Sequence, residues 1–542
     1  MASEAIKLEP QTAFGVSRSF SGRRWNLRAS DEAAIAALVR DGGISDSLAR
    51  ILAGRSVQPH ELTDILNPTL KRLLPEPFLL KDMERAVQRA REAVEKGEKI
   101  AVFGDYDVDG SASSALMANF LTAIGRPPRI YIPDRMTEGY GPNADAMRLL
   151  ASEGAQLVIT VDCGATAVAA LTAAKEAGLD VVVLDHHAVE TLPPSFAQVN
   201  PNQPGDTSGL GFLCAAGVTF LFLLALNRSL RESGWYTASN VIAPNLMDYA
   251  DIVGLATICD VVPLVGVNRA FVRAGLAKLA EGGRPGLSAL AAIAKAEAPF
   301  TPYHLGFIFG PRINAGGRIG KCSLGVELLS ALDHESALDI AKRLDTHNRE
   351  RQALESMILD NAAAMATTQS NAPFLLVSDE GWHPGVVGIV AGRLKERFAK
   401  PAFVAGFEGG VGRGSARSIP GIDIGVMVRA AHEKGLIESG GGHEMAAGFS
   451  LAVHQLDGFR EFLAEQFNNT AAAFDAALAL DIDALVSPSG ANVTLVREIA
   501  KAGPYGAGNA EPLIVVPDVR VAFADVVGKD HVRLRVSTGA GP

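Results

Sequence analysis

Residues 180–187 read DVVVLDHH, a short apolar run that ends in one aspartate and two histidines. Two other stretches have the same form, KIAVFGDYDVDG (99–110) and QLVITVDCG (156–164), and helix-like segments separate the three. Continuous apolar strands that alternate with helices predict a parallel sheet covered on both faces. Ligands of open parallel sheets bind outside the carboxyl ends of the strands, so the polar ends should meet in one crevice.

The polar ends carry an unusual density of carboxylates. Asp105, Asp107 and Asp109 alternate in the first motif, and a fourth motif, TICDVVPL (257–264), adds Asp260. Carboxylates this close repel one another unless cations neutralise them. Oxygen ligands suit Mg²⁺ and Mn²⁺. Each motif alone is also typical of an ordinary strand-end turn, so the prediction of a metal site rests on the set.

The second and third motifs add the remaining ligands. Asp162 is placed to bridge two ions, and His186 supplies a nitrogen, which favours Mn²⁺ over Mg²⁺. His187 is a candidate phosphate contact, and Asp185 is a candidate support for its neighbours. Two divalent ions activate water and stabilise both oxygens of an in-line displacement at phosphorus. The sequence therefore predicts a phosphoester hydrolase without a nucleophilic Ser or Cys, and Ser111 is expected only to cap a helix.

Composition sets limits on the rest of the molecule. The 542 residues are too many for one hydrophobic core, so several domains are expected. The net charge of −10 excludes a whole-protein basic field, so any polyanion site must be a local groove. Four cysteines without a Cys-x-x-Cys pair argue against a zinc ribbon and fit a reducing cytoplasm. The apolar stretch 212–226 is too short to span a membrane and predicts a buried helix.

The remaining segments predict an α/β multidomain chain. Residues 335–368 contain neither Pro nor Gly and predict one long helix that connects two domains. A second α/β segment follows it, and short β-like runs begin near residue 475. The predicted domains are an N-terminal leader (1–75), a parallel-sheet domain (76–334), the connecting helix (335–370), a smaller α/β domain (371–470) and a small β domain (471–542).

Motifs rich in arginine and glycine supply candidate phosphate contacts. PRINAGGR (311–318), GGVGRGSARS (409–418) and SGGGHEMAAGF (439–449) are expected to be glycine-containing loops or turns whose backbone and arginines face an anion. PDRMTEGYG (133–141) adds Arg135 and Tyr140. A plain flexible loop, or for Arg135 a surface ion pair, explains each motif equally well when it is taken alone. The candidate substrate-contacting residues are Arg135, Arg312, Asn314, Arg318, Ser415, Arg417 and His443.

Taken in order, the motifs resemble those of a known superfamily. GDYDVDG, PDRMTEGYG, TVDCG, DHH, LATICDVVPL, PRINAGGR, WHPGVVGIVAGRL, GSARS and GGH are similar to the motifs of the DHH phosphoesterases and, within them, of the RecJ family of single-strand-specific exonucleases. The resemblance implies a catalytic DHH domain, a connecting helix, a DHH-associated domain and an OB-fold. It also implies 5′→3′ degradation of single-stranded DNA to mononucleotides, with two Mn²⁺ or Mg²⁺ ions, in DNA repair and recombination.

The resemblance also implies roles for individual residues. One metal site would comprise Asp109, Asp162, His186 and Asp260, and the other Asp107 and Asp162, with Asp105 next to it. The 5′-phosphate pocket would comprise Arg135, Ser415 and Arg417. Contacts to the strand near the cut would come from Arg312 or Arg318, to the scissile phosphate from His187, and to the groove from His443.

Two departures from the family pattern modify these expectations. Many members have a histidine four residues before Asp107, where this chain has Phe103, so the site that uses Asp107 is expected to be weaker or to fill only with substrate. The family's OB-fold begins at PYGAGNAEP (504–512), and the chain stops soon after HVRLRV, so an incomplete OB-fold with reduced strand binding is expected.

The resulting prediction is a cytoplasmic enzyme that threads a single strand between its two α/β domains. Its partners would be single-stranded DNA with a 5′ end, a single-strand-binding protein and a RecQ-type helicase, with no membrane. One alternative is a DHH phosphodiesterase for nanoRNA or small nucleotides. The other is a catalytically weak scaffold that binds DNA, although such scaffolds typically lose the carboxylates that are retained here.

Overall fold

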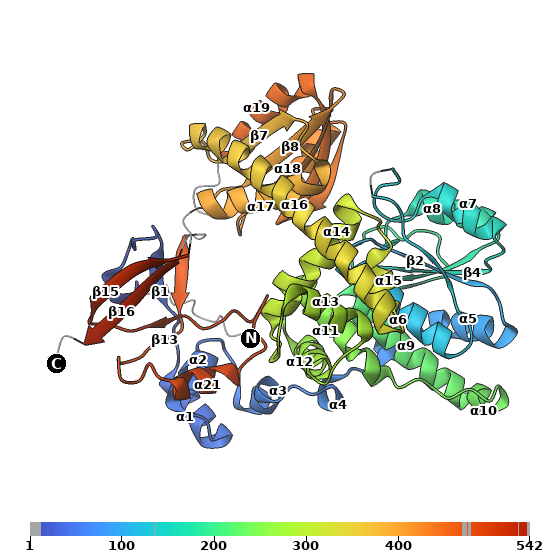
Figure 1. The fold of residues 1–542 in the computed structure, drawn as a ribbon, viewed down its shortest axis with the longest axis horizontal. Coiled ribbons are helices and arrows are strands. Elements are labelled where there is room, and N and C mark those ends of the chain that lie inside the picture. Colours follow the sequence, from blue (N-terminus) through green and yellow to red (C-terminus); the bar gives the residue numbers. More distant parts are fainter. Residues whose placement is uncertain (1–11, 136, 469–473, 475–477, 529–530, 539–542) are drawn as a thin grey trace, which may run out of the picture. The chain divides into compact units, whose positions relative to one another are not determined.

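The computed structural model describes residues 12–135, 137–468, 474, 478–528 and 531–538 (Figure 1). Two compact units account for them. Unit A comprises the described residues of 61–349 and 500–511, and unit B comprises those of 1–60, 350–499 and 512–542. The predicted boundary at residues 470 and 471 lies outside the described residues.

Unit A is built on the predicted parallel sheet. Its five strands are all parallel and run in the order β3-β2-β4-β5-β6. The three strands predicted from the opening motifs are β2, β4 and β5, and they form the centre of the sheet. The strand bounds are β2 (Ile100–Gly104), β3 (Arg129–Tyr131), β4 (Leu157–Val161), β5 (Asp180–Leu184) and β6 (Ala197–Val199).

Helices cover both faces of this sheet, as its continuous apolar strands predicted (Figure 1). Alternate residues of β2 enter different cores, because successive strand side chains point to opposite faces. Ile100 and Val102 join the larger core, whereas Ala101 and Phe103 join the smaller one. The covering helices are α5 (Met83–Lys96), α6 (Val108–Ala123) and α9 (Ala215–Glu232) on the first face, and α7 (Ala144–Ser152) and α8 (Val168–Glu176) on the second.

The motif PRINAGGR was predicted as a loop, and that prediction is wrong. It forms the helix α14 (Gly310–Ile319), which continues a π-helical segment, His304–Phe309. Its glycines serve close packing: a Cβ at Gly310 would lie 2.6 Å from the Cys259 Sγ, and one at Gly317 would lie 2.9 Å from the Tyr106 carbonyl oxygen. The other helices of unit A are α3 (Leu62–Leu66), α4 (Leu70–Leu73), α10 (Trp235–Ala238), α11 (Ala250–Cys259), α12 (Gly266–Ala280), α13 (Pro285–Ala294) and α15 (Leu324–Ser330).

The long helix α16 (His334–Thr368) connects the two units and matches the predicted range closely. Ala341 and Leu344, in its first half, are buried in the core of unit A. Ile358 and Ala362, in its second half, are buried in a core of unit B. One continuous helix therefore contributes to two separate hydrophobic cores.

Unit B contains a second five-stranded sheet, of mixed direction, in the order β10-β11-β9-β8-β7. Its strands are β7 (Leu375–Glu380), β8 (Ala402–Glu408), β9 (Val411–Arg417), β10 (Ser439–His443) and β11 (Ala446–Ala452). The accompanying helices are α17 (Pro384–Phe398), α18 (Ile424–Glu433) and α19 (Leu456–Phe467).

Two glycine-rich motifs of this sheet were predicted as loops or turns, and they are strands. GGVGRGSARS supplies β9, and SGGGH supplies β10. In β9 the small residues alternate with polar ones, and a Cβ at Gly414 would lie 2.2 Å from the ring of Phe449. The glycines therefore make room for aromatic side chains on the core face, while the polar residues occupy the other face.

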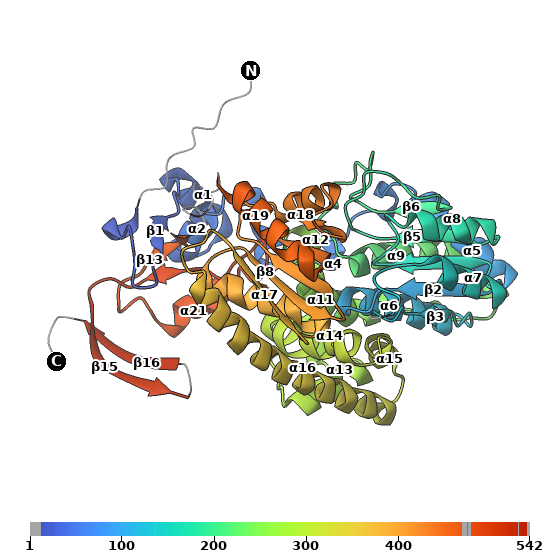
Figure 2. The same cartoon turned by 90° about the horizontal axis from the view of Figure 1, so that it is seen from above.

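The N-terminal segment and the C-terminal β segments pack together in unit B (Figures 1 and 2). The strand β1 pairs in parallel with β12, β13 pairs with β14, and β15 pairs with β16 in an antiparallel hairpin. Among the described residues, no helix is both long and apolar enough to cross a membrane. The element bounds are α1 (Glu32–Gly42), α2 (Asp46–Ala53), α21 (Val493–Ala500), β1 (Arg24–Leu27), β12 (Ala479–Ile482), β13 (Ala484–Leu485), β14 (Ile514–Val515), β15 (Val519–Val527) and β16 (His531–Thr538).

Candidate metal centre and substrate-contacting residues

The loop between β2 and α6 places the first three carboxylates. Asp107 is the N-cap of α6, and its Oδ1 accepts a hydrogen bond from the Gly110 N–H at 3.0 Å. Ser111, expected to cap the helix, is buried inside it instead. A Cβ at Gly110 would lie 2.5 Å from the carbonyl oxygen of Asp105, so the glycine lets the helix start directly above that carbonyl. Asp109 lies in the first turn of the helix.

Asp109 is held by a helix more than 100 residues away. Its two carboxylate oxygens accept hydrogen bonds from the backbone N–H groups of Ala215 (2.6 Å) and Ala216 (2.8 Å). These are the first residues of α9, so the carboxylate caps that helix and benefits from its dipole. This contact could not be predicted from the sequence, because nothing in the apolar segment 212–226 marks a carboxylate partner.

Asp162 follows β4 in a left-handed backbone conformation, with φ of 59°. This conformation is uncommon for a residue with a side chain and concentrates at functional sites. The Tyr140 hydroxyl donates a hydrogen bond to the Asp162 carbonyl oxygen at 3.0 Å. The sequence grouped Tyr140 with the candidate phosphate contacts but did not predict this hydrogen bond, which identifies Tyr140 as a support for the turn at Asp162.

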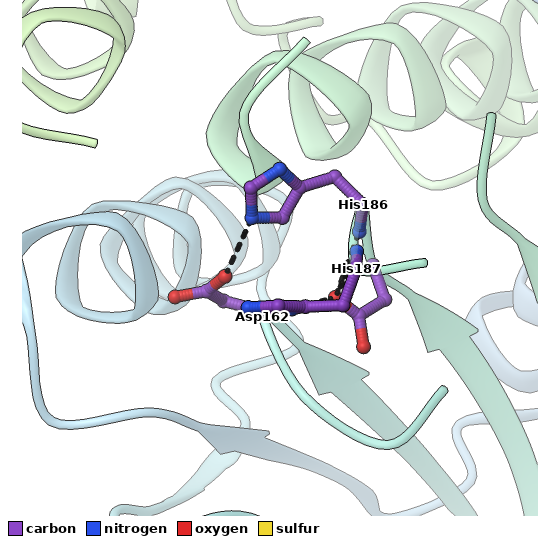
Figure 3. Close-up of side chains that lie close together, drawn as sticks. Asp162, His186 and His187 are labelled. Atoms are coloured by element: carbon purple, nitrogen blue, oxygen red, sulfur yellow. Dashed lines mark hydrogen bonds and ion pairs between the residues drawn. The ribbon is translucent and has the colours of Figure 1, made fainter. Parts of the chain in front are cut away.

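His186 lies among three carboxylates, and Figure 3 shows one of them, Asp162, beside its ring. Its Nε2 is 3.4 Å from Asp162 Oδ1, 3.7 Å from Asp260 Oδ2 and 3.9 Å from Asp109 Oδ2. Asp260 reaches this position as the C-terminal cap of α11. These are the four residues that the sequence assigned to one metal site.

A second group of possible ligands overlaps the first. Asp105, Asp107 and Asp162 each place a carboxylate oxygen within 4.8 Å of the others. Asp162 belongs to both groups, so it occupies the position that a bridging ligand requires. Phe103 offers no ligand atom to either group, and its buried ring stacks on Tyr131 with centroids 5.2 Å apart.

The electrostatics of this cluster fit cations. Burial, with repulsion from Asp107, raises the pKa of Asp109 to about 7. Burial, with repulsion from Asp109, raises the pKa of Asp260 to about 9, and burial holds the pKa values of Asp105 and Asp162 well above their usual range. Asp105 Oδ1 and Asp260 Oδ2 are buried oxygens without a hydrogen-bond partner. Unpartnered buried carboxylate oxygens are costly, and a divalent cation would remove that cost.

The two histidines differ in charge. Burial, with the neighbouring His187, lowers the pKa of His186 to about 4, so its ring is neutral and can act as a metal ligand. Burial opposes protonation of His187, but the hydrogen bond with Asp185 prevails and raises the pKa of His187 to about 9. Its Nδ1 lies 2.7 Å from Asp185 Oδ1, and Asp185 also accepts from the backbone N–H groups of Ala165, His186 and His187. Asp185 therefore holds an imidazolium at position 187.

The remaining candidates of unit A have varied surroundings. The Asn314 side-chain oxygen accepts from the Val108 N–H at 3.1 Å, so this residue supports the metal-binding loop. Arg312 Nε donates to Asp345 Oδ1 at 3.0 Å. Arg135 lies over the ring of Tyr106, with its guanidinium carbon 5.2 Å from the centroid. Arg318 is half-buried on α14.

The candidates of unit B share one face of its sheet. Ser415 and Arg417 are two residues apart on β9, and the Arg417 Nη1 donates to the Ser415 Oγ at 2.9 Å. A Cβ at Gly388 of α17 would lie 3.1 Å from that hydroxyl, so the absence of a side chain there keeps the pair accessible beside the helix. His443 pairs with Ala446, which in turn pairs with Arg417, so His443 lies on the same face two strands away.

Comparison with known proteins extends these observations. Three family models match in order: the DHH family N-terminal domain (residues 99–257), the DHHA1 domain (371–469) and the RecJ OB domain (482–541). The single-stranded-DNA-specific exonuclease RecJ of Dickeya dadantii is 34% identical over 512 residues, which cover 91% of this chain and 87% of the relative. The chain belongs to the RecJ family. The RecJ of Bacillus subtilis is 33% identical over 523 residues, and the match covers 95% of this chain but 64% of that longer relative.

Solved RecJ structures share the fold. The crystal structure of RecJ from Thermus thermophilus in complex with Mn²⁺ aligns with a TM-score of 0.78 at 29% identity, covering 96% of this chain and 74% of that one. A structure of the same protein in complex with Mg²⁺ aligns with a TM-score of 0.73. This RecJ family member therefore shares its architecture with a protein whose crystal structures contain Mn²⁺ or Mg²⁺, the two ions predicted from the ligand types of this chain.

Proposed function

We propose that this chain is a metal-dependent exonuclease that degrades single-stranded DNA from the 5′ end and releases 5′-mononucleotides. One observation carries the proposal: Asp162 lies both against His186 of the Asp109–His186–Asp260 group and within the Asp105–Asp107–Asp162 group, in a member of the RecJ family. The family relation supports the substrate, and the ligand geometry supports hydrolysis at phosphorus.

Each of the two ligand groups would bind one metal ion. Asp109, His186 and Asp260 would hold one Mn²⁺ or Mg²⁺ ion together with Asp162. Asp162 also completes the second group, formed with Asp105 and Asp107. Two such ions supply activation of water and charge neutralisation at both oxygens of an in-line displacement.

The residues around the cluster orient the phosphate. His187 carries a proton on its ring at neutral pH, because Asp185 accepts from its Nδ1. Its second ring nitrogen is then a cationic donor, which suits a contact to the scissile phosphate. Tyr140, through its hydrogen bond to the Asp162 carbonyl, fixes the turn that directs the shared carboxylate.

A separate site sets the polarity of digestion. Ser415 and Arg417 are assigned to the 5′ phosphate, and their hydrogen bond supports this by fixing the guanidinium before ligand arrives. Arg135 is assigned to the same phosphate by the family resemblance, and Arg312 or Arg318 to the strand near the cut. Asn314 acts through the metal loop, and His443 contributes to the groove.

The cellular setting follows from this activity. An exonuclease that acts on the 5′ ends of single strands needs a source of unpaired DNA. The proposed partners are therefore a RecQ-type helicase and a single-strand-binding protein, and the proposed processes are DNA repair and recombination. A cytoplasmic location is supported by four cysteines that are all free.

The decisive experiment is digestion of matched oligonucleotides labelled at the 5′ or the 3′ end, single-stranded or duplex, with Mn²⁺, Mg²⁺ or chelator. Early release of labelled mononucleotide from the 5′-labelled single strand, lost with chelator, is expected. Faster hydrolysis of a dinucleotide than of any longer strand would instead identify a small-nucleotide phosphodiesterase and overturn the proposal.

A further inference from the structure

The segment 12–27 of unit B forms a short hairpin that takes no part in the steps above. Thr12 forms an antiparallel bridge with Asn26, and the Trp25 N–H donates to the Val16 carbonyl oxygen at 3.0 Å. Its second strand, β1, then pairs with β12 along four residues. The hairpin is therefore an ordered part of unit B that is attached where the matched RecJ OB domain begins.

The tip of the hairpin presents an aromatic ring to solvent. The Ser19 N–H donates to the Arg23 carbonyl oxygen (2.8 Å), the Gly22 N–H donates to the Ser19 carbonyl oxygen (2.9 Å), and the Arg23 N–H donates to the Ser19 Oγ (3.1 Å). These bonds close a tight turn with Phe20 at its apex. The exposed fraction of Phe20 is 111%, so its ring touches almost nothing in the protein. Phe20 contributes to no hydrophobic core, so packing within the protein does not explain why this turn presents an aromatic ring to solvent.

The same hairpin concentrates positive charge. Residues 12–30 contain four arginines and no acidic residue, in a chain whose net charge is −10. Arg28 is paired with carboxylates of the neighbouring β segment. Arg18, Arg23 and Arg24 form no ion pair with any described residue, and Arg18 and Arg23 are exposed on either side of Phe20.

An exposed aromatic ring between unpaired arginines fits one kind of ligand well. Proteins bind single-stranded nucleic acid by combining basic contacts to the backbone with aromatic rings on which bases stack. We propose that hairpin 12–27 binds the single-stranded DNA substrate, with Arg18, Arg23 and Arg24 contacting phosphates and Phe20 stacking on a base. The inference rests on the proposed function for the identity of the strand, and it assigns part of strand binding to a segment outside the three matched domains.

Binding of a long single strand under chelator, followed by fluorescence anisotropy across a salt series, tests the proposal. Phe20→Ala is expected to weaken binding roughly tenfold, the typical loss for one stacked base. Arg18→Glu/Arg23→Glu is expected to lower the slope of log affinity against log salt by about 1.4, since each phosphate contact on a single strand contributes about 0.7.

Matched controls separate these effects from general surface changes. Ile242 is 91% exposed in unit A, so Ile242→Ala removes an equally exposed apolar side chain elsewhere. Arg85→Glu/Arg397→Glu makes the same charge change at two exposed arginines outside the hairpin that also form no ion pair with any described residue. Both controls are expected to bind like the wild type, and all variants are expected to hydrolyse a dinucleotide at the wild-type rate.

The outcomes distinguish this inference from the proposed function. If the wild type binds and degrades the long strand while both hairpin variants keep its affinity and salt slope, the hairpin assignment is wrong and the exonuclease stands. If the wild type neither binds nor degrades single-stranded DNA, the proposed function fails first. Loss of binding to an acidic peptide, with DNA affinity unchanged, would identify a protein partner and overturn the assignment.

Discussion

The ligand cluster around His186 in unit A and the Ser415–Arg417 pair in unit B manage their charges in different ways. In the cluster, buried carboxylates face one another, two of their oxygens have no hydrogen-bond partner, and the pKa values of Asp109 and Asp260 are raised to about 7 and about 9. In the pair, the guanidinium already donates to a hydroxyl and to a backbone carbonyl at 2.9 Å each.

This difference separates two kinds of preorganisation. Without metal ions, the carboxylates of the cluster repel one another. Bound cations would neutralise that repulsion. In the pair, hydrogen bonds to neighbouring groups hold the guanidinium in place before any anion arrives, and a guanidinium is a strong donor to phosphate. Changes in the cluster should therefore affect chemistry and stability together, whereas changes in the pair should affect substrate preference alone.

The largest effect is expected for Asp162→Ala, which removes the carboxylate common to both ligand groups. Metal assistance supplies several kcal/mol of barrier lowering, so hydrolysis should fall by roughly a thousandfold or more. Strand binding measured under chelator should remain close to wild type. Asp162→Asn is the matched variant, because asparagine tolerates the left-handed backbone at this position. Cleavage near the wild-type rate in either variant would contradict a shared ligand.

The second effect concerns the stability of the metal-free protein. Asp109 and Asp260 have folded-state pKa values raised from 3.8 to about 7 and about 9. A carboxyl group with a raised pKa favours the folded state in its protonated form, so its contribution is complete below about pH 4 and is lost as the pH rises through the folded pKa. The melting temperature of the chelated protein should therefore fall between about pH 5 and about pH 9, relative to Asp109→Asn/Asp260→Asn. Mn²⁺ should reverse the fall, and a chelated protein whose pH profile matches that of the double variant would contradict the repulsion.

The sequence predicted the cluster more completely than the pair for a physical reason. Asp105 and Asp162 directly follow a short apolar strand and His186 lies two residues after one, and parallel strands bring such ends together whatever surrounds them. Local sequence was therefore sufficient to place side chains that are 57 or 81 residues away from Asp105 in the chain.

The glycine motifs could not be predicted in the same way. Glycine is compatible with a loop, a helix or a strand, so a glycine-rich motif alone does not determine which of these forms. The groups that pack around the glycines contribute to that choice. In β9, Gly414 leaves space for the ring of Phe449, and in α14, Gly317 leaves space for Tyr106. Those partners are distant in sequence, as are the Ala215 and Ala216 N–H groups that hold Asp109.

A third, smaller effect is expected for Arg417→Ala in unit B. A charge-assisted contact to phosphate is worth about 1.5–3 kcal/mol, so the preference for a 5′-phosphorylated over a 5′-hydroxyl strand should fall roughly tenfold to a hundredfold. The rate on the 5′-hydroxyl strand and the pH profile of stability should both stay unchanged, since Arg417 is outside the cluster. Arg397→Ala, at an exposed arginine late in α17, is the control. A uniform loss on both substrates would make Arg417 a general strand contact.

The smallest effect on catalysis is expected for Phe103→His, which introduces the histidine of the family pattern two residues before Asp105. The wild-type ring is fully buried against Tyr131, so the polar replacement should cost about 1–3 kcal/mol of folding stability. If the second ligand group is weak because that histidine is missing, the variant should bind a second Mn²⁺ more tightly in a calorimetric titration without substrate. Phe103→Leu should share part of the stability loss and none of the gain in metal affinity. Equal Mn²⁺ affinity in the histidine variant and the wild type would mean that Asp105, Asp107 and Asp162 already form a complete site.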